Sequence, residues 1–150
     1  MLTIRPSRPE DRDALFGIWL AAVRATHDFL TEEDIAYYAG QVREAYLPQA
    51  EFLVAVDGAD RPVGFMGMTG AKIDALFVDP SRHGQGVGRA LVSQARSRVP
   101  VLEVDVNEQN GRARAFYERL GFRETSRSEL DDSGRPFPLI HMALMEGTGG

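Results

Sequence analysis

Stretches in which apolar positions recur at every second residue predict β-strands. Phe52, Val54 and Val56 follow this spacing in one stretch, and Leu102 and Val104 follow it in another. A period of two places successive side chains on opposite faces of a sheet. Together with the turn residues between such stretches, it predicts strands over 3–5, 52–56, 62–69, 73–78, 102–106, 122–130 and 137–144.

Other stretches carry apolar residues at every third or fourth position and predict α-helices. The first helix follows Ser7-x-x-Glu10, which has the spacing of a capping box, and should end near His27. Thr31 is placed to cap a second helix that runs until Pro48. A third helix is expected over 87–98, and a fourth between residues 110 and 121.

The resulting order, β-α-α-β-β-β-α-β-α-β-β, predicts a mixed sheet with helices on both faces. A chain of 150 residues is long enough for one compact domain, which we expect to cover 1–150. Residues 146–150 are expected to form a flexible tail.

Composition and charge narrow the function classes. The absence of cysteine excludes disulfides, thiolate metal sites and a cysteine nucleophile, and three scattered histidines lead us to expect no metal. The net charge of −5 argues against nucleic-acid binding and favours a cationic substrate. No apolar run approaches the roughly 20 residues that span a bilayer, and residues 1–9 contain no apolar stretch typical of a signal peptide. We therefore expect a cytoplasmic protein without a membrane partner.

The stretch 75–90, ALFVDPSRHGQGVGRA, combines a strand-like run, a turn and three alternating glycines that open a helix. Glycines in such a turn can adopt φ > 0, and the first amides of a helix lack intrahelical partners. Free N–H groups and the helix dipole together attract a phosphate or pyrophosphate. Arg82, His83 and Arg89 would add positive character.

Three kinds of loop have this general form. A P-loop requires a lysine after its last glycine, but Gly88 is followed by Arg89, and Lys72 is the only lysine in the chain. A dinucleotide fingerprint would need its third glycine at position 89. The acyl-CoA loop, Gln/Arg-x-x-Gly-x-Gly/Ala, is matched at both glycines by residues 83–88, with His83 in place of the first residue.

A second motif lies downstream: Asn110-x-x-Ala113-x-x-Phe116-Tyr117-x-x-x-Gly121-Phe122. With these two motifs, the chain resembles the GCN5-related N-acetyltransferases (GNATs) over nearly all of residues 3–144. The resemblance implies an α/β (α+β) fold with a mixed, mostly antiparallel sheet of about seven strands, flanked by four helices and splayed between strands four and five. It also implies acetyl-CoA as the cosubstrate.

By the same resemblance, the cofactor's pyrophosphate rests on the glycine loop and its pantetheine pairs with the fourth strand like an added strand. In the family, a backbone N–H of this strand polarises the thioester carbonyl, which here places the oxyanion donor near Leu76 or Phe77. The residues implied to bind the cofactor are Leu76, Phe77, Val78, His83, Gly84, Gln85, Gly86, Val87, Gly88, Arg89 and Asn110. Asn107 is expected to cap the following helix instead.

Acetyl transfer to an amine needs a proton acceptor for the ammonium and a proton donor for the thiolate. Tyr117 matches the family tyrosine near the departing sulfur, although the inner face of a helix could also hold it as a core residue. Asp74 resembles the carboxylate that many GNATs hold over the substrate cleft, acting directly or through water. A solvated residue at the strand end is the alternative for Asp74.

The resemblance also implies an acceptor pocket walled by the connection between the first two helices. His27 and Phe29 lie there and are the candidate substrate residues. His27 could instead be a helix C-terminal residue favoured by the dipole. Trp19 and His141 are expected to be core residues, although His141 could face the cleft.

The resemblance implies transfer of acetyl from acetyl-CoA to a primary amine of a small molecule or peptide, and the absence of cysteine favours direct transfer in a ternary complex. A noncatalytic acyl-CoA-binding or interaction module of the same fold is the alternative, and a dinucleotide reductase is a third possibility. The acceptor's identity and the choice between a monomer and a homodimer stay open at this point.

Overall fold

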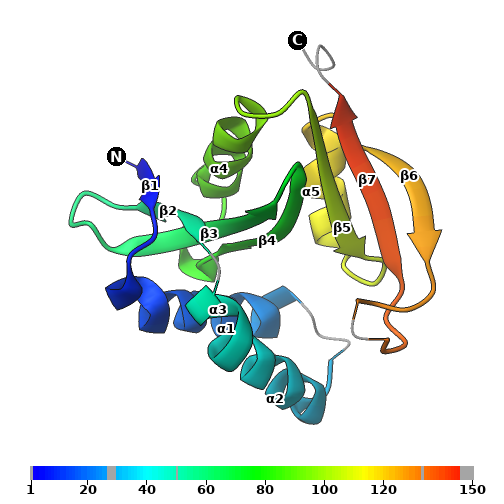
Figure 1. Ribbon diagram of the computed structural model, residues 1–150, viewed down its shortest axis with the longest axis horizontal. Coiled ribbons are helices and arrows are strands. Elements are labelled where there is room, and N and C mark those ends of the chain that lie inside the picture. The colour runs from blue at the N-terminus through cyan, green and yellow to red at the C-terminus, as the bar shows by residue number, and fades with distance from the viewer. Residues whose placement is uncertain (1, 27–29, 50, 133, 146–150) are drawn as a thin grey trace. The chain divides into compact units, whose positions relative to one another are not determined.

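The computed structural model describes residues 2–26, 30–49, 51–132 and 134–145. The strands are β1 (Thr3–Pro6), β2 (Phe52–Val56), β3 (Pro62–Thr69), β4 (Lys72–Val78), β5 (Val101–Asn107), β6 (Arg123–Ser128) and β7 (Leu139–Met145) (Figure 1). The helices are α1 (Arg12–Thr26), α2 (Glu32–Gln41), α3 (Leu47–Gln49), α4 (Val87–Arg96) and α5 (Gly111–Arg119). The predicted order of elements is therefore confirmed.

Hydrogen bonds join the seven strands in the order β1-β2-β3-β4-β5-β7-β6. β1 with β2, β2 with β3, β5 with β7 and β6 with β7 are antiparallel pairs. β4 and β5 run parallel, with Lys72 opposite Glu103 and Ile73 opposite Val104. The mixed, mostly antiparallel sheet implied by the family resemblance is thus confirmed.

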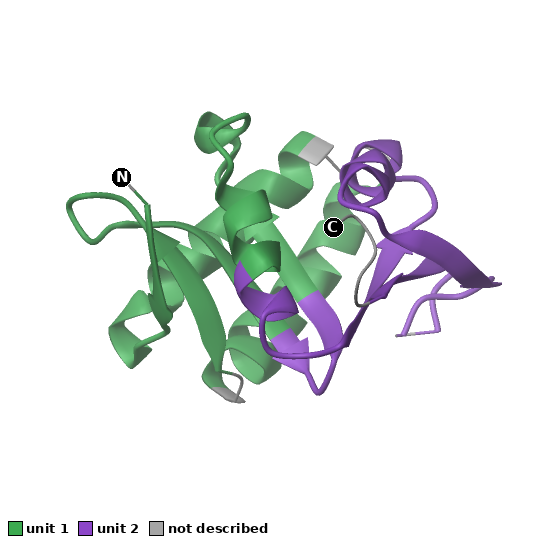
Figure 2. Cartoon of the chain, turned by 90° about the horizontal axis from the view of Figure 1, so that it is seen from above, with its two compact units in different colours: residues 1–67, 75–93 green, residues 68–74, 94–150 purple. Residues whose placement is uncertain are grey.

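The chain forms two compact units, coloured separately in Figure 2. The first contains residues 1–67 and 75–93, and the second contains residues 68–74 and 94–150. β3, β4 and α4 each contribute residues to both units. The single domain expected over 1–150 stays a prediction.

In the first unit, α1 and α4 cover opposite faces of the strands (Figure 1). β3 shows the division clearly, because Phe65 packs into the core beside α1 whereas the neighbouring Gly64 faces Val87 and Leu91 of α4. Trp19 is 5% exposed, which confirms its predicted core position. The buried core on the α1 side consists of Leu15, Ile18, Trp19, Val23, Ile35, Leu47, Phe52, Val54, Val56, Phe65 and Ala75.

The predicted capping box at Ser7-x-x-Glu10 is wrong by one residue. The N–H of Arg8 donates to Asp11 Oδ2 at 2.8 Å, and a 3₁₀ turn over Pro9–Asp11 leads into α1. Ser7 instead joins β1 to β2, since its Oγ accepts from the N–H of Phe52 at 3.0 Å and its own N–H donates to the Phe52 carbonyl at 2.8 Å. Strand pairing occupies the serine, so the cap falls on the next residue.

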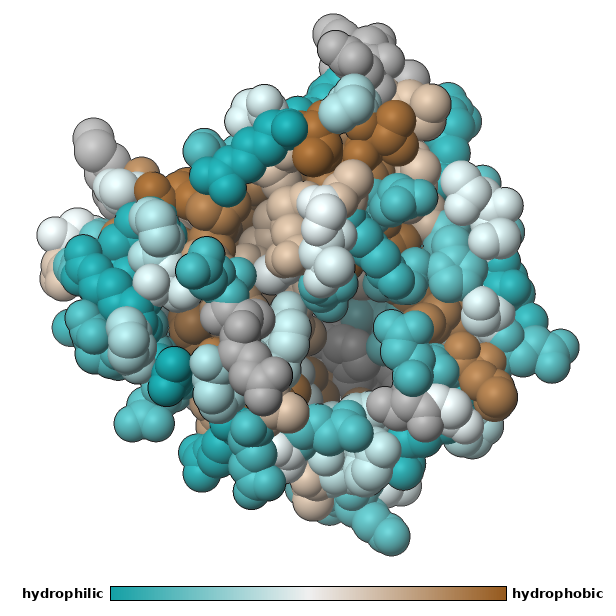
Figure 3. Space-filling view, in the orientation of Figure 1, coloured by the Kyte–Doolittle hydropathy of each residue, from teal (hydrophilic) through white to brown (hydrophobic). Residues whose placement is uncertain are grey.

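The cap predicted for the second helix is confirmed. The N–H of Asp34 donates to Thr31 Oγ1 and the N–H of Thr31 donates to Asp34 Oδ2, each at 3.1 Å. The outward side of α2 is mainly hydrophilic, as the lower part of Figure 3 shows. The helix does not run unbroken to Pro48, however, because a π-helical turn over Val42–Tyr46 separates α2 from α3.

Other predicted boundaries also need correction. α4 ends at Arg96 rather than at residue 98, where the N–H of Arg98 closes a turn on the carbonyl of Ala95. β6 and β7 cover Arg123–Ser128 and Leu139–Met145 rather than 122–130 and 137–144. The connection between them closes on Asp131, whose N–H donates to the carbonyl of Arg135 at 3.0 Å and whose Oδ1 accepts from the N–H of Arg135 at 2.9 Å.

Candidate functional site

The predicted cofactor loop is held to the first unit at its start. The N–H of Asp79 donates to the carbonyl of Val63 on β3 at 2.9 Å. Asp79 Oδ1 then accepts from the N–H of Ser81 at 3.0 Å and caps the 3₁₀ turn Pro80–Arg82. This turn redirects the chain from the end of β4 toward the glycines.

Gly84 and Gly86 adopt the left-handed conformation for which glycine is suited, with φ of +81° and +82°. A Cβ at either position would meet no atom within 4 Å. The requirement for glycine therefore comes from the backbone conformation and from access to the main chain, not from crowding by the protein.

The loop ends in the first turn of α4. The first hydrogen bond of this helix runs from the N–H of Ala90 to the carbonyl of Gly86 at 3.0 Å, so the N–H groups of Val87, Gly88 and Arg89 precede the helical ladder. Val87 is 1% exposed and fixes this turn against Gly64, where a Cβ would lie 2.7 Å from Val87 Cγ1. The arrangement presents a helix N-terminus suited to a phosphate group.

The basic residues of the loop have different surroundings. Arg82 Nη2 lies 3.2 Å from Asp57 Oδ2, so this guanidinium links the loop to the turn between β2 and β3. Hydrogen bonds from the N–H groups of Arg61 and Ala59 lower the pKa of Asp57 and keep it charged. Arg89 is exposed beside the glycines, as is His83.

The β4 residues predicted to line the pantetheine path, Leu76, Phe77 and Val78, are half-buried. The ring of Phe77 packs against Phe65 with centroids 5.7 Å apart, which fixes this end of the strand. The cofactor residues predicted between 76 and 89 all belong to the first unit. Asn110, Tyr117 and Asp74 belong to the second unit.

Tyr117 lies on α5 and is 6% exposed. Its ring packs against Phe116 and Phe122 with centroids 5.1 and 5.2 Å away. Burial raises the pKa of Tyr117 above the ordinary phenol range, so the side chain stays protonated at neutral pH. Gly121, with φ of +102°, closes the helix as predicted: the N–H of Phe122 donates to the carbonyl of Tyr117 at 3.0 Å.

Asn110 caps α5, since its Oδ1 accepts from the N–H of Ala113 at 3.1 Å. The cap predicted at Asn107 is therefore wrong. Asn107 contributes its backbone carbonyl, which accepts from the N–H of Asn110 at 2.9 Å. Asn110 is 8% exposed, and its contact with the cofactor stays a prediction.

Asp74 is exposed on β4 and accepts a hydrogen bond from Oγ1 of Thr69 at the end of β3. The hydroxyl holds the carboxylate in a defined orientation while leaving it accessible to a ligand. This geometry is compatible with a group that meets a cationic acceptor. His27 and Phe29, the predicted substrate residues, lie outside the described residues.

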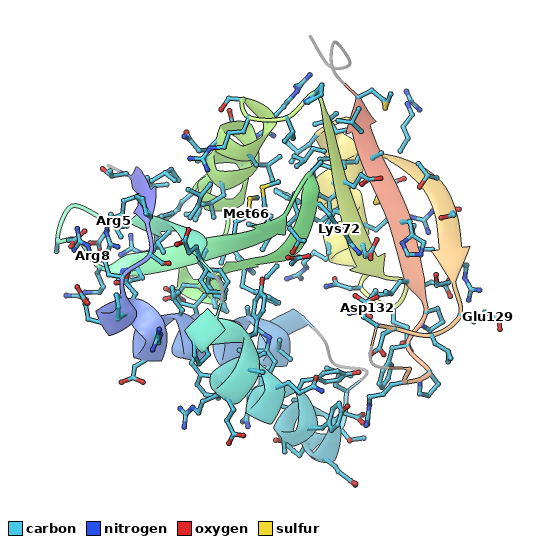
Figure 4. The ribbon with its side chains drawn as sticks, viewed as in Figure 1. Arg5, Arg8, Met66, Lys72, Glu129 and Asp132 are labelled. Carbon is cyan, nitrogen blue, oxygen red and sulfur yellow. The ribbon has the colours of Figure 1, made fainter. Side chains whose placement is uncertain are left out.

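A connected set of polar side chains in the second unit was missed by the sequence prediction. His141 is not a core residue: its side chain is 27% exposed and lies 2.6 Å from Asp105 and 2.6 Å from Ser128. Lys72 completes the set through Asp105 (Figure 4). The signal available in sequence was the occurrence of polar residues at alternate positions of β5 and at His141 within the apolar β7.

Among residues 2–26, 30–49, 51–132 and 134–145, no group of three or more histidine, cysteine, aspartate or glutamate residues is arranged to hold a metal ion. Within the same ranges, no helix is both long and apolar enough to cross a membrane.

Comparisons with known proteins agree with the motifs and the fold. The Acetyltransferase (GNAT) domain family matches residues 27–145. Peptidyl-lysine N-acetyltransferase YjaB of Escherichia coli (strain K12) is 48% identical over 145 residues, which cover 97% of this chain and 98% of that protein. The solution structure of apo-form YjaB from Escherichia coli has a TM-score of 0.92 at 47% identity and covers 98% of this chain and 99% of that one.

A more distant structure, PaiA N-acetyltransferase from Thermoplasma acidophilum in complex with coenzyme A, has a TM-score of 0.76 at 19% identity, covering 97% of this chain and 99% of that chain. At this identity the similarity concerns the fold alone. The family match and the full-length relative, taken with the glycine loop and the seven-stranded sheet, lead to one conclusion: the chain belongs to the GNAT acetyltransferase family.

Proposed function

We propose that this chain transfers the acetyl group of acetyl-CoA to a primary amine by direct attack in a ternary complex. The observation that carries the proposal is the loop before α4, where two left-handed glycines precede the free amides of Val87, Gly88 and Arg89. These donors and the helix dipole suit the cofactor's pyrophosphate. The absence of cysteine in the chain removes the thiol route to an acetyl-enzyme and favours direct attack.

In this proposal, pantetheine runs along Leu76, Phe77 and Val78, and a backbone N–H near Leu76 or Phe77 stabilises the oxyanion. The free amine attacks the thioester carbonyl carbon, a C–N bond forms, and the C–S bond breaks. Tyr117 gives its phenolic proton to the departing thiolate, and the proton that leaves the nitrogen of the new amide restores the phenol, directly or through water. The raised pKa of Tyr117 keeps the phenol protonated at neutral pH, so a proton is present to be given.

Asp74 is the carboxylate that we propose meets the acceptor ammonium, either binding it or taking its proton directly or through water. Its exposure and its hydrogen bond from Thr69 support this placement. A peptidyl lysine is the acceptor we favour within the class of primary amines. The support is the name of the relative that is 48% identical over nearly the whole chain, together with this chain's net charge of −5.

The proposal is tested by measuring acetyl-CoA binding by calorimetry and then thiol release with a panel of lysine peptides, polyamines, aminoglycosides and amino acids. Saturable binding and turnover with a lysine peptide are expected. Binding without turnover on any amine would favour the noncatalytic module, and saturable binding of NADH in place of acetyl-CoA would favour the reductase.

A further inference from the structure

Four side chains from four strands of the second unit form one continuous polar chain. Lys72 Nζ on β4 lies 2.5 Å from Asp105 Oδ2 on β5. Asp105 Oδ1 lies 2.6 Å from His141 Nδ1 on β7, and His141 Nε2 lies 2.6 Å from Ser128 Oγ on β6. Figure 4 labels Lys72, whose side chain lies beside β5.

The donors and acceptors of this polar chain follow from its chemistry. Since an ionised carboxylate can only accept, the ring of His141 donates its Nδ1–H to Asp105. In the neutral ring, Nε2 is then the acceptor and receives the hydroxyl proton of Ser128. Asp105 therefore fixes the tautomer that leaves a proton-accepting nitrogen beside a half-buried hydroxyl.

The carboxyl of Asp105 is held in its charged form within this polar chain. Burial disfavours the charged form of Asp105, but hydrogen bonds from Lys72 and His141 outweigh it and lower the pKa of Asp105. The hydrogen bond to Asp105 raises the pKa of Lys72, and the carboxylates of Asp132 and Asp74 act in the same direction. Lys72 balances Asp105, so the carboxylates of Asp74 and Asp132 leave the vicinity negative, which favours an ammonium ligand.

We propose that His141 is the proton acceptor for the acceptor ammonium and that Ser128 carries the proton between them. This inference rests on the proposed acetyl transfer to an amine. An N–H bond of the ammonium breaks and its proton goes to Ser128 Oγ, while the hydroxyl proton of Ser128 moves to His141 Nε2. The products of this step are a neutral amine, an intact Ser128 hydroxyl and an imidazolium paired with Asp105.

An imidazole suits this step better than a carboxylate does. An alkyl ammonium has a pKa of about 10, an imidazole about 6.5 and an aspartate about 4, so proton transfer to an ordinary imidazole is less uphill by about 2.5 pKa units. Asp74 then has the separate task of attracting and orienting the ammonium. Asp105 is a positioning residue, because it acts through His141.

The test uses the full chain, acetyl-CoA and a short peptide with one lysine and a blocked N-terminus. His141→Asn should lower kcat at pH 7.5 by about 100-fold with the KM for acetyl-CoA nearly unchanged. With 2,2,2-trifluoroethylamine, which is largely neutral at this pH and needs no base to remove an ammonium proton, the same variant should lose less than about threefold. Ser128→Ala should show the same selectivity with a smaller loss.

Ser126→Ala provides the matched control, since Ser126 is an exposed serine on the same strand. It should retain wild-type rates with both amines. Equal rates for His141→Asn and wild type on the lysine peptide would overturn the base assignment while leaving the acetyltransferase proposal standing. Equal losses on both amines, in both His141→Asn and Ser128→Ala, would also overturn it, because a merely structural role predicts that result. An inactive wild type that still binds acetyl-CoA would overturn both proposals.

Discussion

Replacement of Gly86 by alanine tests whether the left-handed loop matters for cofactor binding. Its φ of +82° would cost an alanine about 1–2 kcal/mol. No steric cost is added, because a Cβ at this position has nothing within 4 Å. The smaller entropy of the unfolded alanine chain offsets about 0.4–1 kcal/mol of this strain, which leaves a net stability loss of about 1 kcal/mol if the loop keeps its conformation.

The strained loop can also relax, in which case stability is retained but the amides before α4 no longer converge on the phosphate. Recovering the binding conformation then costs acetyl-CoA affinity about 1–2 kcal/mol, which raises Kd by about 5- to 30-fold. In the unrelaxed case, Tm falls by about 2–4 °C. Gly86→Ala should therefore change at least one of the two quantities.

Thermal unfolding and acetyl-CoA titration of the same preparation measure both. Gly58→Ala is the matched control, because Gly58 also has nothing within 4 Å of its Cβ position and its φ is outside the left-handed range. It should leave affinity unchanged. If Gly86→Ala retained both the wild-type Tm and the wild-type Kd, the left-handed conformation would have no role in the proposed phosphate site.

Three further predictions concern stability and catalysis. Asp11 and Arg5 are 7% and 12% exposed and lie 2.8 Å apart, so Asp11→Ala should cost about 3 kcal/mol at pH 7 in a denaturant titration. The hydrogen bond from Arg5 lowers the pKa of Asp11, so the stability that the ion pair contributes is present above the unfolded pKa of about 4 and should disappear as the pH falls through the lower folded pKa. A stability difference between wild type and Asp11→Ala that persisted at pH 2 would contradict the ion-pair origin. Tyr117→Phe should lower kcat by about 100-fold with little change in Tm. If thiol-release assays showed an unchanged kcat, the role of Tyr117 would be packing alone. Asn110→Ala should destabilise the fold by about 1 kcal/mol, whereas Asn110→Asp can still cap α5 and should not. A loss of acetyl-CoA affinity in both variants would support the cofactor contact, and unchanged affinity in both would assign Asn110 to capping alone.

Much of the fold could be predicted because the hydrophobic periods are local. The alternation through 52–56 and 102–106 marks β2 and β5 correctly. The cap at Arg8 could not be predicted in the same way, because the hydroxyl of Ser7, the expected cap, bonds to Phe52, which lies far along the chain. Local rules identify residues able to cap a helix, but tertiary partners decide which residue does so.

In the candidate site, too, features with a local sequence signature were predictable and features that depend on strand register were not. The glycine loop was predictable, since φ > 0 and a helix start leave a local signature at Gly84 and Gly86. The contact of His141 with Ser128 depends on cross-strand register, which includes a β-bulge between Glu124 and Ser126. Beyond this bulge, Ser126 pairs with His141 and Ser128 with Leu139, so Ser128 shares a face with the histidine. A one-residue difference would turn Ser128 to the other face.

The ion pair of Lys72 with Asp105 has a consequence for self-modification. Lys72 is the only lysine in the chain. The other basic side chains of the protein are arginine guanidinium groups, which stay protonated, and histidine imidazoles. The pKa of Lys72 is raised by its carboxylate partner, so its nitrogen lone pair is rarely free. When this protein is held at high concentration with acetyl-CoA, its own lysine should therefore compete little with the acceptor amine for the acetyl group.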